Sequence, residues 1–174
     1  MTRPISGKLF EGVFRRVLGA DVPAEVLSKL GELGVDLNAL QPTYPRETWY
    51  RAIAETAAAL YPSDAGQLRK LGRRIVTSLV SKDLIKGPWL GMARLLGPRR
   101  ALKQAVERMD SNVVKLHLHE KSKHEFEIVA DETEQAEFLA GLIEAALELL
   151  GGRDAKAVVV GPRGNSTVFS ATWR

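Results

Sequence analysis

Apolar side chains recur every three or four positions along the first 110 residues, the spacing that lines one face of an α-helix. The clearest row consists of Phe10, Val13, Phe14 and Val17. Pro45 can open a helix because its missing N–H needs no partner in the first turn, and Gly97-Pro98 can interrupt one. The pattern predicts helices over residues 7–19, 23–33, 46–60, 63–81, 88–96 and 99–108, with Ser63 as the cap of the fourth.

From residue 111 onward the period changes to two, which is typical of strands. Residues 114–119 and 125–128 alternate between apolar and polar, which predicts a hairpin with its turn at 121–123. A register that keeps the apolar side chains on one face leaves the histidines on the other. The expected cross-strand pairs are Leu116 with Ile128, Leu118 with Phe126, His117 with Glu127, and His119 with Glu125.

A further helical pattern follows this hairpin and runs to Leu150. Asp131 and Glu134 have the spacing of a capping box at its start, and Gly151-Gly152 can stop it. The end of the chain then predicts a strand over 155–160, a turn over 161–165 and a last alternating strand through Trp173.

This order of elements predicts an α+β fold. An N-terminal helical part, residues 1–110, is followed over 111–174 by a β-hairpin, a long helix and a β-hairpin that form a four-stranded antiparallel sheet. A length of 174 residues suits a single domain. Gly72 lies in the apolar stripe of the helix predicted over 63–81, where glycine costs about 1 kcal/mol relative to alanine, so it indicates a close contact with another helix.

Composition narrows the function mainly by exclusion. The chain has no cysteine, which excludes disulfides, thiolate zinc sites and cysteine nucleophiles. No apolar run approaches the roughly 20 residues of a membrane span, and the first residues do not resemble a secretory signal, so we expect a cytoplasmic protein. Phosphate-binding glycine loops and nucleophile-elbow motifs are missing from the sequence, so we do not expect an enzyme.

The net charge of +4 hides an uneven distribution. Residues 69–103 contain ten basic residues and one acid, whereas residues 131–148 contain six acids and no base. Such asymmetry suits a basic patch for an anionic partner, or simply two solvated faces. Nucleic acid is the less favoured partner, because the basic segment matches no groove-reading motif.

Several short motifs, in this order along the chain, resemble those of a known family. They are Ile5-Ser6-Gly7-Lys8-Leu9-Phe10, Tyr44-Pro45 with Trp49, Leu60-Tyr61-Pro62, Leu71-Gly72-Arg73-Arg74, Leu95-Leu96-Gly97-Pro98-Arg99-Arg100, Phe138-x-x-Gly141-x-x-Glu144-x-x-Leu147 and the terminal Trp173. By these motifs the chain resembles the myxobacterial paralogous family of uncharacterised proteins. That family has no established activity, so the resemblance implies little about function.

The layout of helical part, hairpin, long helix and hairpin is also similar to the haem nitric-oxide/oxygen-binding superfamily. That superfamily includes the vinyl-4-reductase domain of bacterial regulators and the subunits of the transport-protein particle. The resemblance implies the fold, and either a ligand held between helices and sheet or dimerisation. Fold alone does not determine function.

The histidines argue against haem and against a metal ion. Haem needs an axial ligand in an apolar pocket, but two of the three histidines, His117 and His119, fall on the polar face of their strand; the third is His124. The superfamily's tyrosine-serine-arginine motif for the haem propionates is not found. Lysines surround the histidines and disfavour a metal ion, so we expect neither cofactor nor metal.

Two groups of residues are candidates for binding. An apolar pocket between helices and sheet would be lined by Tyr44, Trp49, Tyr61 and Trp89, with Arg73 or Arg74 holding an anion at the rim. The same aromatic residues could equally belong to the core. An anionic contact or partner surface would use Lys82, Lys86, Arg99, Arg100 and Lys103, together with the segment 81–91 and the apolar Leu90 and Leu95.

The sequence therefore predicts a non-enzymatic regulatory or adaptor domain that binds a protein partner or forms a homodimer. The main alternative is a haem-free sensor whose interior pocket binds a small apolar or anionic molecule. A second alternative is a basic nucleic-acid-associated protein.

Overall fold

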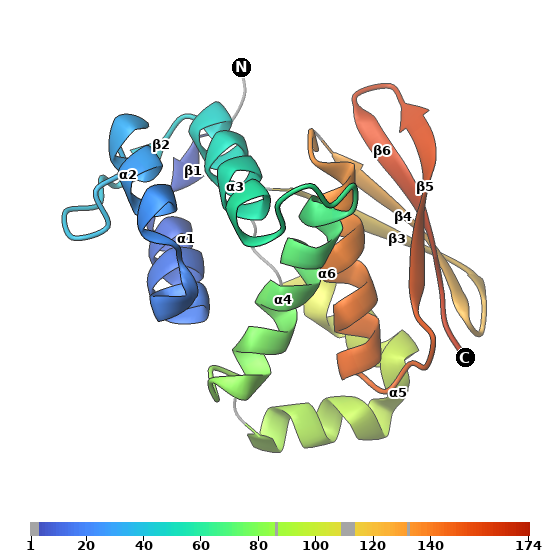
Figure 1. Cartoon of the computed structure of the whole chain (residues 1–174). Helices are drawn as coiled ribbons and strands as arrows, with labels where there is room; N and C mark the ends of the chain where they lie inside the picture. The colour runs from blue at the N-terminus through green and yellow to red at the C-terminus, as the bar shows by residue number, and fades with distance from the viewer. Residues whose placement is uncertain (1–3, 86, 109–113, 132) are drawn as a thin grey trace.

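A computed structural model describes residues 4–85, 87–108, 114–131 and 133–174, without the side chains of Trp89 and Arg108. The helices α1 to α3 lie on one side of the molecule and a β-sheet on the other, with α4 and α6 side by side between them (Figure 1). The molecule is therefore layered, with α4 on the side of the helices and α6 on the side of the sheet.

The N-terminal part is mainly helical, with two short strands. Its elements are β1 (Ile5–Ser6), α1 (Gly7–Phe10), a π-helical segment (Glu11–Leu18), a 3-10 turn (Gly19–Asp21), α2 (Ala24–Glu32), β2 (Thr43–Tyr44), α3 (Arg46–Leu60), α4 (Gln67–Ser81) and α5 (Gly87–Arg108). The helix predicted over 7–19 thus changes to π geometry halfway. The predicted break in α5 is confirmed, because Gly97 has φ 74° and ψ 162°.

The C-terminal part contains two hairpins and one helix, which confirms the predicted fold class. Strands β3 (Leu116–Ser122) and β4 (Glu125–Asp131) precede α6 (Ala136–Leu149), which is followed by β5 (Lys156–Arg163) and β6 (Ser166–Thr172). Within the described residues these strands form an antiparallel sheet in the order β3-β4-β6-β5. The two hairpins therefore join through β4 and β6 at the centre of the sheet.

Two predicted helix caps are wrong. Ser63 lies in the turn before α4 with φ 63°, and Gly66 precedes the helix instead. Asp131 ends β4 rather than capping α6, because its carboxylate accepts a hydrogen bond from Ser166 Oγ across the sheet. Ser63 thus has a backbone conformation unlike that of a helix cap, and the Asp131 side chain is used by a competing cross-strand partner.

The predicted register of the first hairpin is also wrong, by two residues. Leu118 pairs with Ile128 and Leu116 with Ala130, so His117 lies opposite Val129 and His119 opposite Glu127. The hairpin turns at residues 123–124 instead of 121–123. A shift of two residues keeps every side chain on its predicted face, so the alternation could not detect the error.

Two clusters of buried apolar side chains meet at α6. The first cluster fills the space among α1, α2, α3 and α4 around Phe10, Phe14 and Ile53, whereas the second lies between α6 and the sheet around Phe126 and Phe169. Leu142 of α6 packs against both. The long helix therefore has one face on the sheet and another on the helical layer.

Helices α4 and α6 touch backbone to backbone at a pair of glycines, as the position of Gly72 predicts. A Cβ added at Gly72 would come within 3.0 Å of the Leu142 nitrogen and closer still to the Phe138 carbonyl oxygen. A Cβ at Gly141 would come within 3.0 Å of the Arg69 Cα and closer still to its carbonyl oxygen. Neither helix can accept a side chain at this point without moving away from the other.

We predict that Gly141→Ala lowers the free energy of unfolding by about 2 kcal/mol or more, because the added methyl group must separate two backbones. Denaturant unfolding followed by circular dichroism measures this loss. Gly31→Ala in α2 is the matched control, since a Cβ there meets nothing within 4 Å. The control should be neutral or stabilising by up to about 1 kcal/mol. Equal effects of the two substitutions would contradict the close contact.

Candidate functional site

The predicted aromatic residues Tyr44 and Trp49 lie in the core of the helical layer. The ring centroid of Phe10 is 4.8 Å from that of Tyr44 and 5.3 Å from that of Trp49, the latter in an edge-to-face arrangement. The Tyr44 hydroxyl accepts a hydrogen bond from the Gln41 backbone N–H at 2.9 Å. Both side chains are only 3% exposed, so they stabilise the packing of α1 against α3.

The other predicted pocket residues are dispersed. Tyr61 follows the end of α3 and is half-buried beside Arg74, whose guanidinium lies 3.3 Å from the Asp21 carboxylate. Hydrogen bonding to Tyr61 and then to Asp21 raises the pKa of Arg74 above its ordinary value despite partial burial. The side chain of Trp89 lies outside the described residues. The structure does not bring the described members of this set into one cavity.

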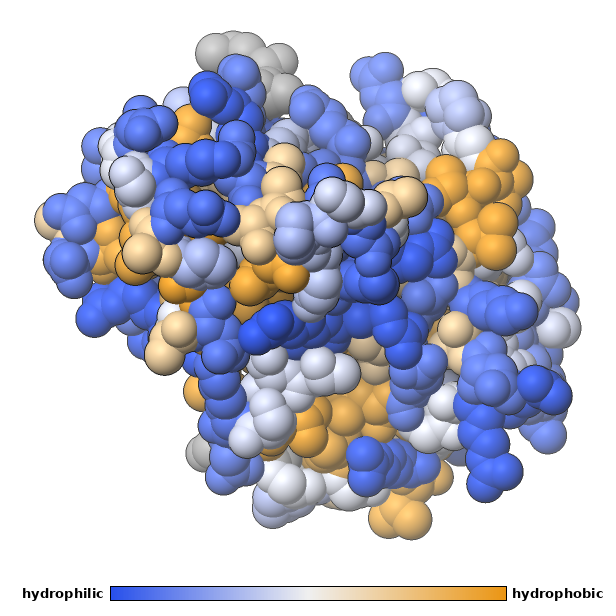
Figure 2. Space-filling view, in the orientation of Figure 1, coloured by the Kyte–Doolittle hydropathy of each residue, from blue (hydrophilic) through white to orange (hydrophobic). Residues whose placement is uncertain are grey.

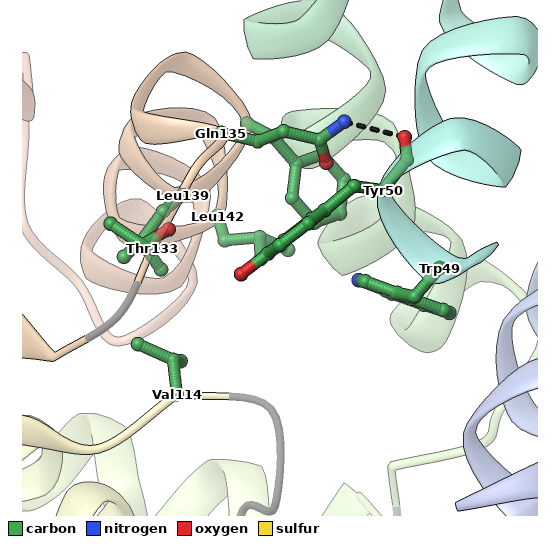
Figure 3. Close-up of a pocket in the computed structure, with 8 residues that line it drawn as sticks. Trp49, Tyr50, Val114, Thr133, Gln135, Leu139 and Leu142 are labelled. Carbon is green, nitrogen blue, oxygen red and sulfur yellow. Dashed lines mark hydrogen bonds between the residues drawn. The ribbon is translucent and has the colours of Figure 1, made fainter. Parts of the chain in front are cut away.

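A small cavity does lie between α3 and α6, and Trp49 lines it (Figure 3). It measures about 50 Å³, and Tyr50, Gln135 and Leu142 form other parts of its wall. Gln135 Nε2 donates to the Tyr50 carbonyl oxygen at 2.6 Å, while Gln135 Oε1 is buried with no hydrogen-bond partner among the described residues. A cavity of this size has room for ordered water next to Gln135, whereas pockets for small molecules are about 300 Å³ or larger.

A buried carboxylate connects the two layers of the molecule next to the glycine pair. Glu144 of α6 accepts hydrogen bonds from Arg69 Nη1 at 2.5 Å, Arg73 Nη1 at 3.2 Å and the Ala157 backbone N–H at 3.1 Å. Its side chain is only 9% exposed. Glu144 therefore joins α4, α6 and β5 at one point.

The predicted anion-binding residue Arg73 is engaged in this cluster. Besides Glu144, its guanidinium contacts the Glu148 carboxylate at 2.6 Å. Burial is the largest influence on Arg73 and lowers its pKa, but Glu148 and Glu144 together raise the pKa above its ordinary value. Arg69 forms a second bridge, to Glu137 at 2.8 Å.

The sequence analysis did not predict that Arg69, Glu144 and Glu148 form one ion-pair cluster with Arg73, although the sequence contains a signal for it. The two arginines are four residues apart and the acids recur at helical spacing on α6, so each set lies on one face of its helix. What the sequence could not show is that these two faces meet.

The described residues of the predicted basic surface do not form one patch: Lys82 contacts the first helices, Arg99 and Lys103 contact β3, and Arg100 has neither contact. Lys82 Nζ donates to the Leu18 carbonyl at 2.9 Å and lies 3.7 Å from Asp21. Arg99 and Lys103 hold Glu120 of β3 at 2.8 Å and 2.6 Å, and the hydrogen bond from Lys103, followed by the charge of Arg99, lowers the pKa of that carboxyl. Arg100 forms no ion pair with a described residue, and Lys86 lies outside the described residues.

The three histidines lie on the exposed surface of the first hairpin. His117 Nε2 is 3.1 Å from the Asp131 carboxylate, and Ser166 first, then His117, lower the pKa of Asp131. In the described part of the chain no three histidine or acidic side chains are grouped as metal ligands would be. None of the helices in the described ranges has both the length and the apolar composition that a membrane span requires.

Solved structures define the class of fold. An unliganded iron(II) H-NOX mutant from K. algicida is 13% identical with a TM-score of 0.57, covering 98% of this chain and 97% of the other. An oxygen-binding H-NOX domain related to soluble guanylate cyclases, in its oxygen complex, is 12% identical with a TM-score of 0.60, covering 98% and 95%. A mutant of T. tengcongensis H-NOX is 14% identical with a TM-score of 0.55, covering 97% and 95%.

The protein therefore has an H-NOX-like fold, which is compatible with a regulatory domain. More particularly, it belongs to the family described as protein of unknown function (DUF2378), whose model matches residues 3–174. A search of curated proteins gives no match.

We predict that Glu144→Ala lowers the free energy of unfolding by about 2–3 kcal/mol, because two guanidinium groups and a backbone N–H lose a buried acceptor. The figure is reduced from that of a fully buried pair because both arginines are partly exposed. Glu148→Ala, in the exposed part of the same cluster, should cost less than about 1 kcal/mol. Denaturant unfolding measures both variants, and a loss no larger for Glu144→Ala than for Glu148→Ala would contradict this role.

Proposed function

We propose that this protein is a haem-free, non-enzymatic regulatory domain that acts through contact between proteins. The observation that supports this most is the packed joint between its layers, where α4 and α6 touch at a glycine pair and the described cavity between α3 and α6 measures only about 50 Å³. A regulatory domain of this kind would use its surface rather than its interior.

The residues present do not fit haem. Haem requires an axial ligand inside an apolar pocket large enough for a porphyrin, whereas all three histidines are on the exposed surface of a hairpin. The described cavity between α3 and α6 measures only about 50 Å³. The interior sensor pocket considered from the sequence meets the same difficulty of size.

The charge of the basic segment also disfavours a general nucleic-acid contact. Arg69, Arg73, Arg74, Arg99 and Lys103 all form ion pairs with acids of this same chain. Phosphate binding draws on unpaired basic side chains, and most of this segment is already neutralised.

The exposed face of α5 is the surface that best suits a protein contact. Leu95 is 89% exposed and Met92, three residues earlier, is 63% exposed, so both project from the same side of the first half of α5. Figure 2 shows hydrophobic atoms at the lower edge of the molecule, where Figure 1 places α5. Leu90 of the same helix is buried at 9%, which anchors the helix while Leu95 stays free. A second copy of the chain is the simplest partner for this face.

We predict that titration of the purified protein with haemin gives no saturable, sharp Soret band, because the three histidines are all exposed and the described interior cavity measures only about 50 Å³. An H-NOX domain titrated in parallel serves as the positive control. One equivalent of tightly bound haem that resists gel filtration would contradict the haem-free proposal.

We predict that the protein self-associates as its concentration rises and that Leu95→Asp abolishes this, since a charge placed in an apolar contact must be desolvated. Sedimentation velocity over a concentration series measures the association. Leu27→Asp is the matched control, because Leu27 is also exposed, at 47%, but lies on α2. A wild-type chain that stays monomeric throughout, or equal effects of both substitutions, would contradict the α5 contact.

A further inference from the structure

A groove lies where the kink in α5 meets the turn of the β3–β4 hairpin and the end of the sheet. It measures about 340 Å³ and is lined by Leu96 and Pro98 of α5, by Lys123 of the turn and by Trp173 after β6, among other residues. Its volume is within the range of small-molecule sites and several times that of the interior cavity. No part of the proposed haem-free function or of the α5 protein contact depends on it.

The walls of this groove are held in place by the fold. The Trp173 backbone N–H donates to the His124 carbonyl at 3.2 Å, and its ring lies 5.5 Å from that of buried Phe126. Gly97, with its positive φ of 74°, turns the chain between the two halves of α5 and so sets Pro98 at the edge of the groove. The fold therefore holds the apolar part of the groove in place, whereas Arg100 and Lys123 contribute exposed side chains.

The groove is strongly basic. Arg99, Arg100, Lys123 and Arg174 contribute to its lining, and no acidic residue does. Arg99 is paired with Glu120 at 2.8 Å and Arg174 with Asp154 at 2.8 Å. Neither Arg100 nor Lys123 forms an ion pair with a described residue, so two positive charges remain uncompensated at the mouth of the groove.

We propose that this groove binds a small organic phosphate, in which a phosphate monoester group is attached to a compact apolar ring. A phosphate monoester carries close to two negative charges at neutral pH, which matches the free charges of Arg100 and Lys123. The planar guanidinium can bind two phosphate oxygens at once, and the lysine ammonium adds a point charge. Leu96, Pro98 and Trp173 provide the apolar surface against which the ring would pack.

Isothermal titration calorimetry at constant ionic strength tests both halves of this ligand. Phenyl phosphate is the probe, inorganic phosphate lacks the ring, and phenol lacks the phosphate. We expect phenyl phosphate to bind at least about tenfold more tightly than either fragment, because each fragment loses one set of contacts. Inorganic phosphate binding as tightly as phenyl phosphate would show an anion patch without a pocket and would overturn the proposal.

Variants locate the binding. Arg100→Gln and Lys123→Gln should each weaken phenyl phosphate binding by about tenfold, the effect of losing one charge-assisted hydrogen bond. Arg51→Gln, at an exposed arginine of α3, is the matched control and should leave affinity unchanged. Unchanged affinity in both groove variants would overturn the assignment, and circular dichroism checks that all variants are folded.

A further titration distinguishes a free small molecule from a phosphorylated protein, since both carry a phosphate monoester group. N-acetyl-phosphotyrosine amide should bind no more tightly than phenyl phosphate, because its backbone atoms would extend beyond the groove and make no further contacts there. A phosphotyrosine peptide that binds more than about tenfold more tightly would show that the natural ligand is a protein side chain, against the proposal. Loss of self-association in Leu95→Asp with phenyl phosphate binding intact would separate this site from the protein contact.

Discussion

The contact between α4 and α6 is the interaction on which the rest of the structure depends. Gly72 and Gly141 let the two backbones touch, and beside them Glu144 accepts hydrogen bonds from Arg69, Arg73 and the backbone of β5. The ion pairs depend on the glycines, because they form at the separation of α4 and α6 that the glycines permit. Since α4 belongs to the helical layer and α6 to the sheet layer, this one joint fixes how the two hydrophobic clusters sit against each other.

The close contact between α4 and α6 also limits the space for a ligand beside these two helices. Among the described residues, the cavity between α3 and α6 next to Gln135 measures about 50 Å³, which is the size of a space for ordered water. The protein thus has an H-NOX-like fold, and the binding surfaces that we propose lie around α5. Two different surfaces adjoin there, the exposed apolar side chains of Met92 and Leu95 and the basic groove next to the kink.

The fold explains the uneven charge distribution of the sequence, because it brings the basic segment next to acidic side chains. Most of the basic segment faces acids from elsewhere in the chain, in particular Glu144 and Glu148 of α6 and Glu120 of β3. Each pair joins two elements that are distant in sequence, and its positive and negative charges neutralise each other. The charge left over is therefore local, and at the groove it consists of Arg100 and Lys123.

The sequence by itself determined the kind and order of the main helices and of the four strands of the larger sheet, the break at Gly97 and the need for a close contact at Gly72, because periodicity and backbone preference are local properties. It did not predict the short strands β1 and β2 or the π-helical segment. It left open the hairpin register, since a shift of two residues preserves both faces, and it misplaced two caps, since Ser63 and Asp131 have other conformations or partners in the fold. It also expected Arg73 at the rim of a pocket, whereas only the tertiary structure decided that Arg73 pairs with α6. The sequence could not predict the groove either, because its walls come from four segments that only folding brings together. The energy of contacts between such segments depends on distance in space rather than along the chain.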